Sequence, residues 1–389
     1  MIRTTAVLAA CAMAIMTVSF SVAGPAMCMP SIARDLGLDY AQQGIVFSAP
    51  MWPFALSLVV AALADRVGFR VPLVLASATQ VTGWFLLAEV HSFEQALGAV
   101  LVVGIGGAIA DPLLTPIVCA VCPDRRARMA NLLHAFYCVG LMGAALGVAL
   151  AQAGGLGWRG TFRVLGVLCV PYGVASAVLA MPRQAHLGRV RLKTRVLARQ
   201  PVFWVLALCM VLAAATEMGP ANWLPTLIQS MAPAGGSAAE GGLLAGLGLA
   251  VFGGLMAAGR FGASAMADRL GTRRLLALAA AICTVSLAAV VLPLGTAYRV
   301  VCLGVLGLGV ACFWPTLLAV AGDRFPQAGA SMFSVLSAMG AIGCAAAPVA
   351  LGYLGTAFGS LTWAMAALAP APAVILVMAL RSAPSRSRL

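Results

Sequence analysis

Long apolar stretches alternate with short polar connections along the whole chain. They fall at residues 4–27, 42–63, 71–89, 95–120, 129–152, 162–181, 202–229, 241–266, 274–294, 298–320, 329–354 and 361–380. Each is about as long as the roughly 20 residues that a helix needs to cross a bilayer. Because backbone amides inside hydrocarbon must be paired within their own segment, the pattern predicts an all-α membrane protein with twelve transmembrane helices.

The composition supports this interpretation and excludes a water-soluble protein. Of the 389 residues, 62% are apolar and only 9% are charged, and the mean hydropathy is +1.02. A soluble domain carries about 25% charged residues, so this chain could not cover a water-facing surface. The connections are also too short to form a sizeable soluble domain, and they lack the alternating pattern of a membrane barrel.

The basic residues predict the orientation of the chain in the membrane. Nineteen of the 24 basic residues fall on the side that holds both termini. Arg260 lies within a span, and the other side holds Arg34, Arg159, Arg163 and Arg299. Since cytoplasmic loops are enriched in basic residues, we expect a multi-pass protein of the inner (plasma) membrane with both termini in the cytoplasm. The net charge of +13 is then explained by orientation in the lipid bilayer rather than by nucleic-acid binding.

An internal repeat divides the chain into two halves. Residues 62–68 (ALADRVG) recur as residues 265–271 (AMADRLG), an offset of 203. Three further matches follow in order: Gly24 with Gly219, Gly104 with Gly307, and the pair Gly140 and Gly143 with Gly340 and Gly343. We therefore predict two pseudo-symmetric six-helix bundles, residues 1–182 and 202–389, joined by a cytoplasmic linker, residues 183–201. A substrate site between two such repeats is typical of transporters.

The repeated loop has a recognisable motif. Here the sequence resembles the major facilitator superfamily, whose corresponding loop carries an Asp-Arg-x-Gly core followed by basic residues. The resemblance extends over the whole chain and implies the major facilitator fold. It also implies that charged pairs in the two loops act as a conformational gate. The gate residues would be Asp65, Arg66, Gly68, Arg70, Asp268, Arg269, Gly271 and Arg273.

Two acidic residues lie well inside the apolar stretches, Asp111 and Glu217. A charged side chain at the centre of a bilayer costs about 2.5–3.5 kcal/mol on insertion scales, so such residues usually serve a pathway or a proton relay. We interpret both as proton-coupling residues. The alternative is a structural role, with each carboxyl hydrogen-bonded between helices.

Polar and aromatic residues near these acids suggest a substrate site. The sequence from Glu217 to Pro225 (E-x-x-x-x-N-W-L-P) and the stretch from Asn131 to Gly140 resemble the fucose permease-like, sugar–proton symporting branch of the superfamily. Asn131, His134 and Tyr137 share one helical face. The predicted substrate-binding residues are Asn222, Trp223, Thr115, Asn131, His134, Tyr137 and Trp314. For the tryptophans the alternative is packing or an interfacial aromatic belt.

Arg260 is the basic residue inside a span, and a buried arginine needs an acid, a carbonyl group or an anionic ligand. Two roles remain open from the sequence. Arg260 either pairs with Asp268 at the end of its own helix or contacts an anionic substrate.

The leading hypothesis is a proton-coupled secondary transporter that moves a small hydrophilic solute by alternating access, and the resemblance to the sugar-transporting branch suggests a sugar-like solute. The alternative is an efflux transporter for a drug or a secreted metabolite such as a siderophore. A non-transporting receptor is less favoured because it would not need intramembrane acids. We expect no enzyme activity, because the sequence shows no nucleophile–base pair or metal cluster, and no cofactor or metal site, because the eleven cysteines are scattered. No P-loop precedes Lys193, so the energy for transport would come from a gradient or from a separate ATPase subunit. We also expect a monomer.

Overall fold

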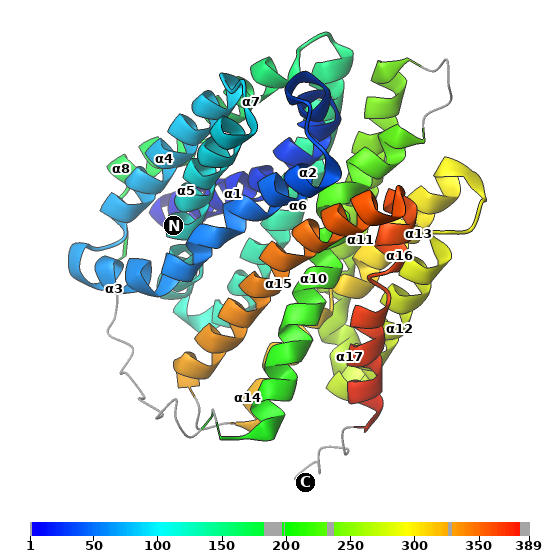
Figure 1. Ribbon diagram of the computed structural model, residues 1–389. Helices are drawn as coiled ribbons and strands as arrows, with labels where there is room; N and C mark the ends of the chain where they lie inside the picture. The colour runs from blue at the N-terminus through cyan, green and yellow to red at the C-terminus, as the bar shows by residue number, and fades with distance from the viewer. Residues whose placement is uncertain (1, 183–196, 198, 232–236, 326–328, 382–389) are drawn as a thin grey trace.

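The computed structural model describes residues 2–182, 197, 199–231, 237–325 and 329–381, and these residues are helical apart from short connections. The helices form two groups that lie side by side (Figure 1). Helices coloured blue through cyan to bluish green belong to the first half of the sequence, and helices coloured bright green through yellow to red belong to the second half. Most of the expected linker, residues 183–201, lies outside the described residues.

The elements of the two halves are bounded as follows. The first half contains α1 (Ile2–Leu36), α2 (Tyr40–Ser48), η1 (Ala49–Leu56), α3 (Ser57–Val67), α4 (Arg70–Ala88), α5 (Phe93–Val121), η2 (Pro123–Arg125), α6 (Arg126–Ala153), α7 (Trp158–Leu168) and α8 (Val170–Val178). The second half contains α10 (Pro201–Ser230), α11 (Ala238–Leu270), α12 (Thr272–Ala289), α13 (Gly295–Val310), α14 (Phe313–Arg324), α15 (Gly329–Phe358), α16 (Leu361–Ala366) and α17 (Pro370–Arg381).

Proline residues explain where the long apolar stretches are interrupted. Within the described ranges, 11 helices are long and apolar enough to cross a membrane. The remaining expected span, residues 42–63, is divided into α2, the 3-10 helix η1 and α3. Pro50 and Pro53 lie in η1, and proline removes a backbone donor and clashes with the preceding turn. The expected segment is therefore present as a broken helix.

The internal repeat is visible in the contacts of matching glycines. A Cβ atom on Gly106 would lie 2.7 Å from the Ala76 carbonyl oxygen, and one on Gly309 would lie 3.1 Å from the Ala279 carbonyl oxygen. Both the glycines and the alanines are related by the offset of 203 found in the loop motif. The two halves therefore use the same close approach between neighbouring helices, as expected for pseudo-symmetric bundles.

The structure corrects one match of the repeat. A Cβ atom on Gly140 would lie 2.7 Å from the Met16 Cα atom, and one on Gly343 would lie 2.9 Å from the Val211 carbonyl carbon. Gly140 thus corresponds to Gly343, whereas the sequence comparison had paired it with Gly340. The error is three residues, which is close to one helical turn, so spacing along the chain could not distinguish the two. Only the contact with the neighbouring helix does.

The repeated loops place their arginines within each half. Gly68 and Gly271 both have φ of +77°, a conformation that glycine adopts without strain. Arg70 Nη2 donates to the Leu179 carbonyl oxygen at 3.0 Å, and Arg273 Nε donates to the Ala379 carbonyl oxygen at 2.9 Å. Each arginine therefore caps the last helix of its own half, where a positive charge is favourable.

The structure shows no partner that would test the other residues of the predicted gate among the described side chains. Arg66 and Arg269 are exposed to solvent. The side chains of Asp65 and Asp268 lie outside the described part of the chain, so their predicted role in a gate stays a prediction.

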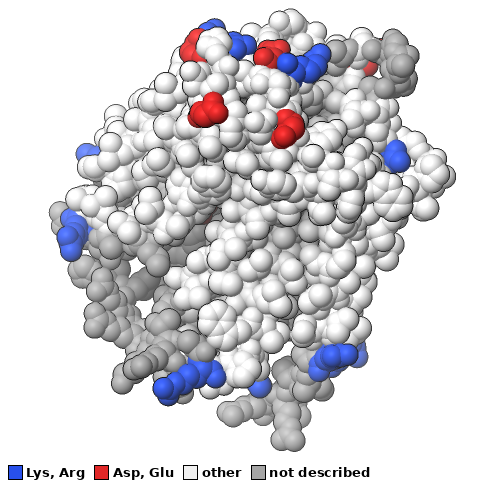
Figure 2. All heavy atoms as spheres, in the orientation of Figure 1, with Lys and Arg blue, Asp and Glu red and all other residues white. Residues whose placement is uncertain are grey.

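Charged side chains distinguish the two ends of the bundle. We call the end that holds Asp35, Asp39, Glu89, Glu94 and Glu240 the acidic end, and the end that holds Arg66, Arg70, Arg269, Arg273 and Arg381 the basic end. Figure 2 shows the acidic side chains gathered over the upper part of the molecule together with some basic ones, a largely uncharged surface across its middle, and only basic side chains among the charged ones at its lower edge. The middle surface is the one expected to face lipid.

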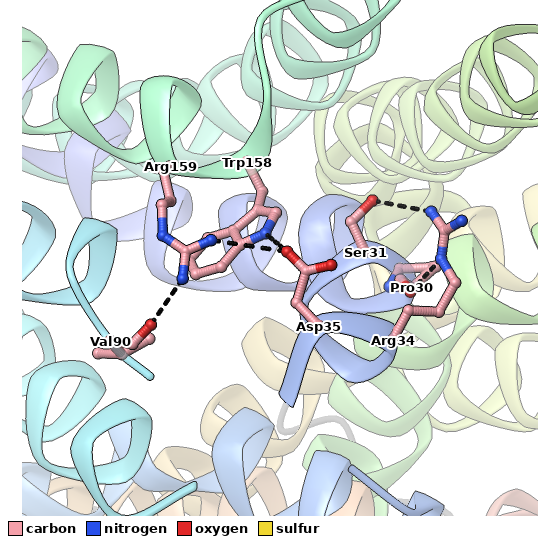
Figure 3. A network of polar contacts seen from close by, with 7 residues as sticks. All are labelled: Pro30, Ser31, Arg34, Asp35, Val90, Trp158 and Arg159. Carbon is pink, nitrogen blue, oxygen red and sulfur yellow. Dashed lines mark hydrogen bonds and ion pairs between the residues drawn. The ribbon is translucent and has the colours of Figure 1, made fainter. Parts of the chain in front are cut away.

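A polar network ties together three elements of the first half at the acidic end (Figure 3). The Trp158 indole Nε1 donates to Asp35 Oδ2 at 2.7 Å, and Arg159 Nη1 lies 3.5 Å from the same oxygen. Arg159 Nη2 also donates to the Val90 carbonyl oxygen at 2.9 Å. The network therefore connects the end of α1 to the start of α7 and to the connection between α4 and α5.

Replacing Trp158 by phenylalanine should destabilise the acidic end measurably. The change removes the indole donor to Asp35 but keeps an aromatic ring against Phe162, whose centroid lies 5.8 Å away. A hydrogen bond to a charged group contributes about 1.5–3 kcal/mol, and we expect a loss of about 1–2 kcal/mol because Asp35 is half-exposed. Thermal unfolding in detergent measures this, with Trp363→Phe, at a position 59% exposed, as the matched control. Equal melting temperatures for the two variants would contradict the prediction.

The halves meet at the acidic end through closely packed helices. A Cβ atom on Gly44 of α2 would lie 2.6 Å from the Pro348 carbonyl oxygen of α15, and one on Gly352 of α15 would clash with the Tyr40 carbonyl oxygen of α2. Helices α6 and α11 also pack across the junction. In contrast, α5 and α14 make their substantial contacts, among described elements, within their own halves.

Candidate functional site

An ion pair inside the transmembrane region forms the centre of the candidate site. Glu217 lies near the middle of α10, and Arg260 lies in the second half of α11. Arg260 Nη2 is 3.5 Å from Glu217 Oε1, and the two side chains are 20% and 12% exposed, respectively. An intramembrane ion pair of this kind keeps both charges compensated while leaving them within reach of solvent.

The pair is connected to the first half through α6. Arg260 Nη1 donates to the His134 carbonyl oxygen at 3.3 Å, and the His134 ring Nε2 lies 3.4 Å from Thr115 Oγ1 of α5. Tyr137, one turn further along α6, lies close enough to both Glu217 and Arg260 to interact electrostatically. We refer to Glu217, Arg260, His134, Thr115 and Tyr137 as the Glu217 cluster. It joins residues from both halves at their junction.

Asp111, the other predicted proton-coupling residue, lies one helical turn before Thr115 on α5 and is partly buried. Among the described residues, its carboxylate makes no hydrogen bond or ion pair. The structure therefore does not provide the interhelical hydrogen bonds of the structural alternative, and Asp111 is not part of the ion pair.

Asn222 and Trp223 lie apart from the Glu217 cluster, in closed packing. Asn222 is 1% exposed and its side-chain nitrogen donates to the Met218 carbonyl oxygen at 2.8 Å. Trp223 is 0% exposed, and its indole donates to the Pro348 carbonyl oxygen at 2.9 Å. Its ring also meets those of Tyr40 and Phe47 from the other half edge-on, at centroid distances of 5.8 and 5.0 Å. In this structure Trp223 therefore seals the junction at the acidic end.

The two remaining predicted substrate residues have different surroundings. Asn131 is exposed on α6, one turn before His134. Trp314 is partly buried on α14, and its ring lies so close to Gly340 of α15 that a Cβ atom there would be 2.6 Å from Trp314 Cζ3. The sequence predicted substrate binding for both residues, and the structure leaves Asn131 exposed and Trp314 partly accessible.

An apolar cavity of about 410 Å³ lies elsewhere, between α1, α6, α7 and α8 of the first half. Its lining includes Met16, Gly143 and Leu168, and no residue of the Glu217 cluster contributes to it. Its apolar lining does not suit a hydrophilic solute. Among the described residues, no three His, Cys, Asp or Glu side chains lie together in a way that could hold a metal ion.

The Glu217–Arg260 ion pair was not predicted from the sequence. The sequence offered Asp268 or an anionic ligand as partners of Arg260, because Asp268 is near it on the same helix. A usable signal was nevertheless present, since an acid and a base inside two consecutive spans tend to pair in a low-dielectric environment. Hydropathy does not report which faces of α10 and α11 are turned toward each other, so the pairing required the structure.

Comparisons with known proteins identify the family. The profile of the Major Facilitator Superfamily matches residues 9–307 and 243–388. Among curated proteins, the 2-nitroimidazole transporter of Escherichia coli (strain K12) is 27% identical over 239 residues. That match spans 59% of this chain and only 58% of the relative.

Solved structures share the fold at low sequence identity. The nucleoside transporter NupG (D323A mutant) matches with a TM-score of 0.79 and 13% identity over 97% of this chain and 98% of that chain. A bacterial homologue of the human lysosomal transporter Spinster, in an inward-facing and unoccupied conformation, matches with a TM-score of 0.75 and 18% identity over 97% and 95% of the two chains. These likenesses agree with the expected fold. The narrower resemblance to the fucose permease-like branch is not confirmed.

Proposed function

Since the chain belongs to the Major Facilitator Superfamily and is a membrane transporter rather than an enzyme, we propose that it moves a small polar solute by alternating access, coupled to protons at Glu217. The single observation that carries this proposal is the Glu217–Arg260 ion pair at the junction of the halves. A carboxylate that is paired, partly accessible and inside the membrane can bind and release a proton as its exposure changes.

The arrangement of contacts supports access from one end at a time. Between the Glu217 cluster and the acidic end, the halves are closed by Trp223 and by the glycine contacts of α2 with α15. Toward the basic end, α5 and α14 make their substantial contacts within their own halves. The cluster is therefore reached from the basic end, and the opposite state would require the acidic end to separate.

The positive-inside pattern assigns the basic end to the cytoplasm. We therefore place the protein in the inner membrane with both termini cytoplasmic and the transporter open to the cytoplasm. The two bundles, residues 1–182 and 202–389, would rock about the junction as a monomer, and the linker, residues 183–201, would connect them.

The polar side chains of the Glu217 cluster and of its predicted neighbours indicate a small solute with polar groups. Thr115, Asn131, His134 and Tyr137 offer hydroxyl, amide, imidazole and phenol groups along α5 and α6, and Trp314 adds an aromatic face. The sequence suggested sugar-like solutes as candidate substrates, and the name of the curated relative makes 2-nitroimidazole, a planar nitroheterocycle, a further candidate. For Trp223 we propose a sealing role in this conformation, because its indole nitrogen and ring are both engaged in packing.

Uptake into proteoliposomes tests the proposed function. The purified full-length protein is reconstituted, a pH gradient of about one unit is imposed, and labelled 2-nitroimidazole, uridine, L-fucose and D-glucose are offered in turn. One proton per solute could support about tenfold accumulation. Accumulation that vanishes when a protonophore collapses the gradient supports import, and gradient-driven loss from preloaded vesicles supports export. Fluxes that are insensitive to pH gradients of either sign would overturn the proton coupling.

Asp111 should make a smaller contribution to coupling than Glu217. Its carboxylate lies one turn from Thr115 but has no charged partner among the described residues. Asparagine cannot ionise, whereas the ionised form of the Asp111 carboxyl would be unfavourable by about 2.5–3.5 kcal/mol at mid-bilayer. We therefore expect Asp111→Asn to be at least as stable as the unmodified protein and to lose gradient-driven uptake several-fold. Asp124→Asn, in the exposed helix η2, is the matched control. Unchanged uptake would leave Asp111 a structural role only.

A further inference from the structure

The guanidinium of Arg260 has unused hydrogen-bonding capacity. Its two contacts among the described residues are the Glu217 carboxylate at 3.5 Å and the His134 carbonyl oxygen at 3.3 Å. Both are longer than the usual 2.7–3.2 Å of an N–H···O bond. Arginine presents a planar fork of N–H donors that fits a carboxylate with two parallel bonds. Since the side chain is 20% exposed, these donors are within reach of a ligand.

Protonation of Glu217 would leave Arg260 without a counter-ion. Among the described residues, the other titratable groups that interact electrostatically with Glu217 are all uncharged in their ordinary state. They are Tyr137 and Cys138 of α6, Cys344 of α15 and Cys283 of α12. None of them can compensate a guanidinium charge. An uncompensated charge in this environment is strongly unfavourable, so a protonated site favours entry of an anion.

We propose that Arg260 binds the carboxylate of a monoanionic substrate, which replaces Glu217 as the counter-ion when Glu217 takes up a proton. This inference rests on the proposed function and adds the substrate class and the order of coupling. The empty site holds Arg260 and ionised Glu217, and the loaded site holds Arg260, the substrate anion and neutral Glu217. Both states are neutral, whereas the two mixed states carry a net charge.

The charge balance explains why a monoanion is favoured and predicts an electroneutral cycle. A dianion would leave the loaded site negative, and a neutral solute would leave it positive after protonation. Because a net charge at the centre of a bilayer is unfavourable by about 2.5–3.5 kcal/mol, only the two neutral states would exchange readily between the two ends. One proton therefore accompanies one anion, and a pH gradient alone drives the transport.

Binding to the purified full-length protein tests this assignment. The probes are acetate, pyruvate, benzoate and glucuronate, each compared with its neutral amide or with glucose, by isothermal titration calorimetry in lipid nanodiscs. We expect at least one carboxylate to bind and its neutral counterpart not to bind. Binding should weaken by up to about tenfold for each pH unit above the range in which Glu217 titrates, because one proton is taken up with each anion.

Variants separate the role of each charge. Glu217→Gln imitates the protonated carboxyl, so at about pH 7.5 it should bind the carboxylate at least roughly tenfold more tightly than the unmodified protein, with no pH dependence. Arg260→Lys, which keeps the charge but lacks the fork, should weaken binding about tenfold or more, and Arg260→Gln should abolish it. Glu240→Gln, at the exposed start of α11, is the matched control and should bind like the unmodified protein.

Several outcomes would overturn the inference. These are a panel in which no carboxylate binds, equal binding of carboxylates and amides, and a Glu217→Gln variant that binds more weakly. If the arginine variants do not fold, the Glu217→Gln result decides alone. Proton-driven accumulation of neutral solutes without carboxylate binding would leave the proposed function standing and remove only the anion assignment. Carboxylate binding without any proton-driven flux would leave the anion site standing and remove the proposed proton-coupled transport.

Discussion

Glutamine in place of Glu217 should abolish pH-gradient-driven accumulation while leaving solute exchange intact. Glutamine keeps the size of the side chain and a carbonyl oxygen for Arg260, but it cannot release a proton. The loaded site, in which the carboxylate of a monoanionic substrate is the counter-ion of Arg260, can still reorient, so labelled substrate exchanges for unlabelled substrate across the membrane. The empty site now carries the unpaired charge of Arg260 and reorients poorly, because a net charge at mid-bilayer is unfavourable by about 2.5–3.5 kcal/mol. Net movement should therefore stop.

The measurement compares two fluxes in the same proteoliposomes. With a gradient of about one pH unit, accumulation should fall from about tenfold to equality of the two sides, while exchange at equal pH should stay within about threefold of the unmodified rate. Glu240→Gln makes the same chemical change at an exposed position and should accumulate solute normally. Continued accumulation by the Glu217 variant would show that another group carries the proton, and Asp111 would then be the first candidate.

Leucine in place of Gly352 should prevent closure of the acidic end and inhibit transport. Any Cβ atom at this position would clash with the Tyr40 carbonyl oxygen of α2 and lie 3.2 Å from the Trp223 ring. The carbonyl oxygen belongs to the backbone, so a change of rotamer cannot relieve the clash, and α2 and α15 must move apart. Overpacking of this kind costs about 1–3 kcal/mol, which corresponds to a shift of roughly five- to 150-fold between the conformations.

Hydrogen exchange and transport together check this prediction. Backbone amides of residues 40–48 and 348–358 should exchange faster in the variant, because these segments form the closed junction. The transport rate should fall at least about fivefold. Gly98→Leu is the control, since a Cβ atom there meets no heavy atom within 4 Å. Gly352→Ala offers a milder variant if leucine impairs folding. Normal exchange and normal transport would show that the close contact is not needed for closure.

Much of the fold could be predicted from the sequence because it depends on local or additive properties. The apolar stretches predicted the helices, since lipid leaves no other way to pair a backbone amide. Even so, the structure divides one expected span at Pro50 and Pro53. The correspondence between Gly140 and Gly343 in the repeat also became clear only from the contact of Gly343 with α10.

The candidate site was predictable only in part. Glu217, Arg260, His134, Thr115 and Tyr137 could be recognised in the sequence as candidate functional residues. Charged and polar side chains inside a transmembrane span are energetically unfavourable and are therefore usually functional. It did not predict that Glu217 and Arg260 pair. It also assigned Trp223 to substrate binding, whereas in this structure that ring packs between the halves.

The sequence by itself determined the membrane setting, the helical class, the two related halves and the family of this protein. These follow from hydropathy, charge distribution and repeated motifs, all of which can be read from the order of residues along the chain without knowing how the helices pack. Only the tertiary structure decided which side chains meet, because a partner across a junction depends on how each helix is rotated about its axis and how closely its neighbour approaches. That rotation brings Arg260 to Glu217 and to the His134 carbonyl oxygen, and glycine contacts bring α2 to α15.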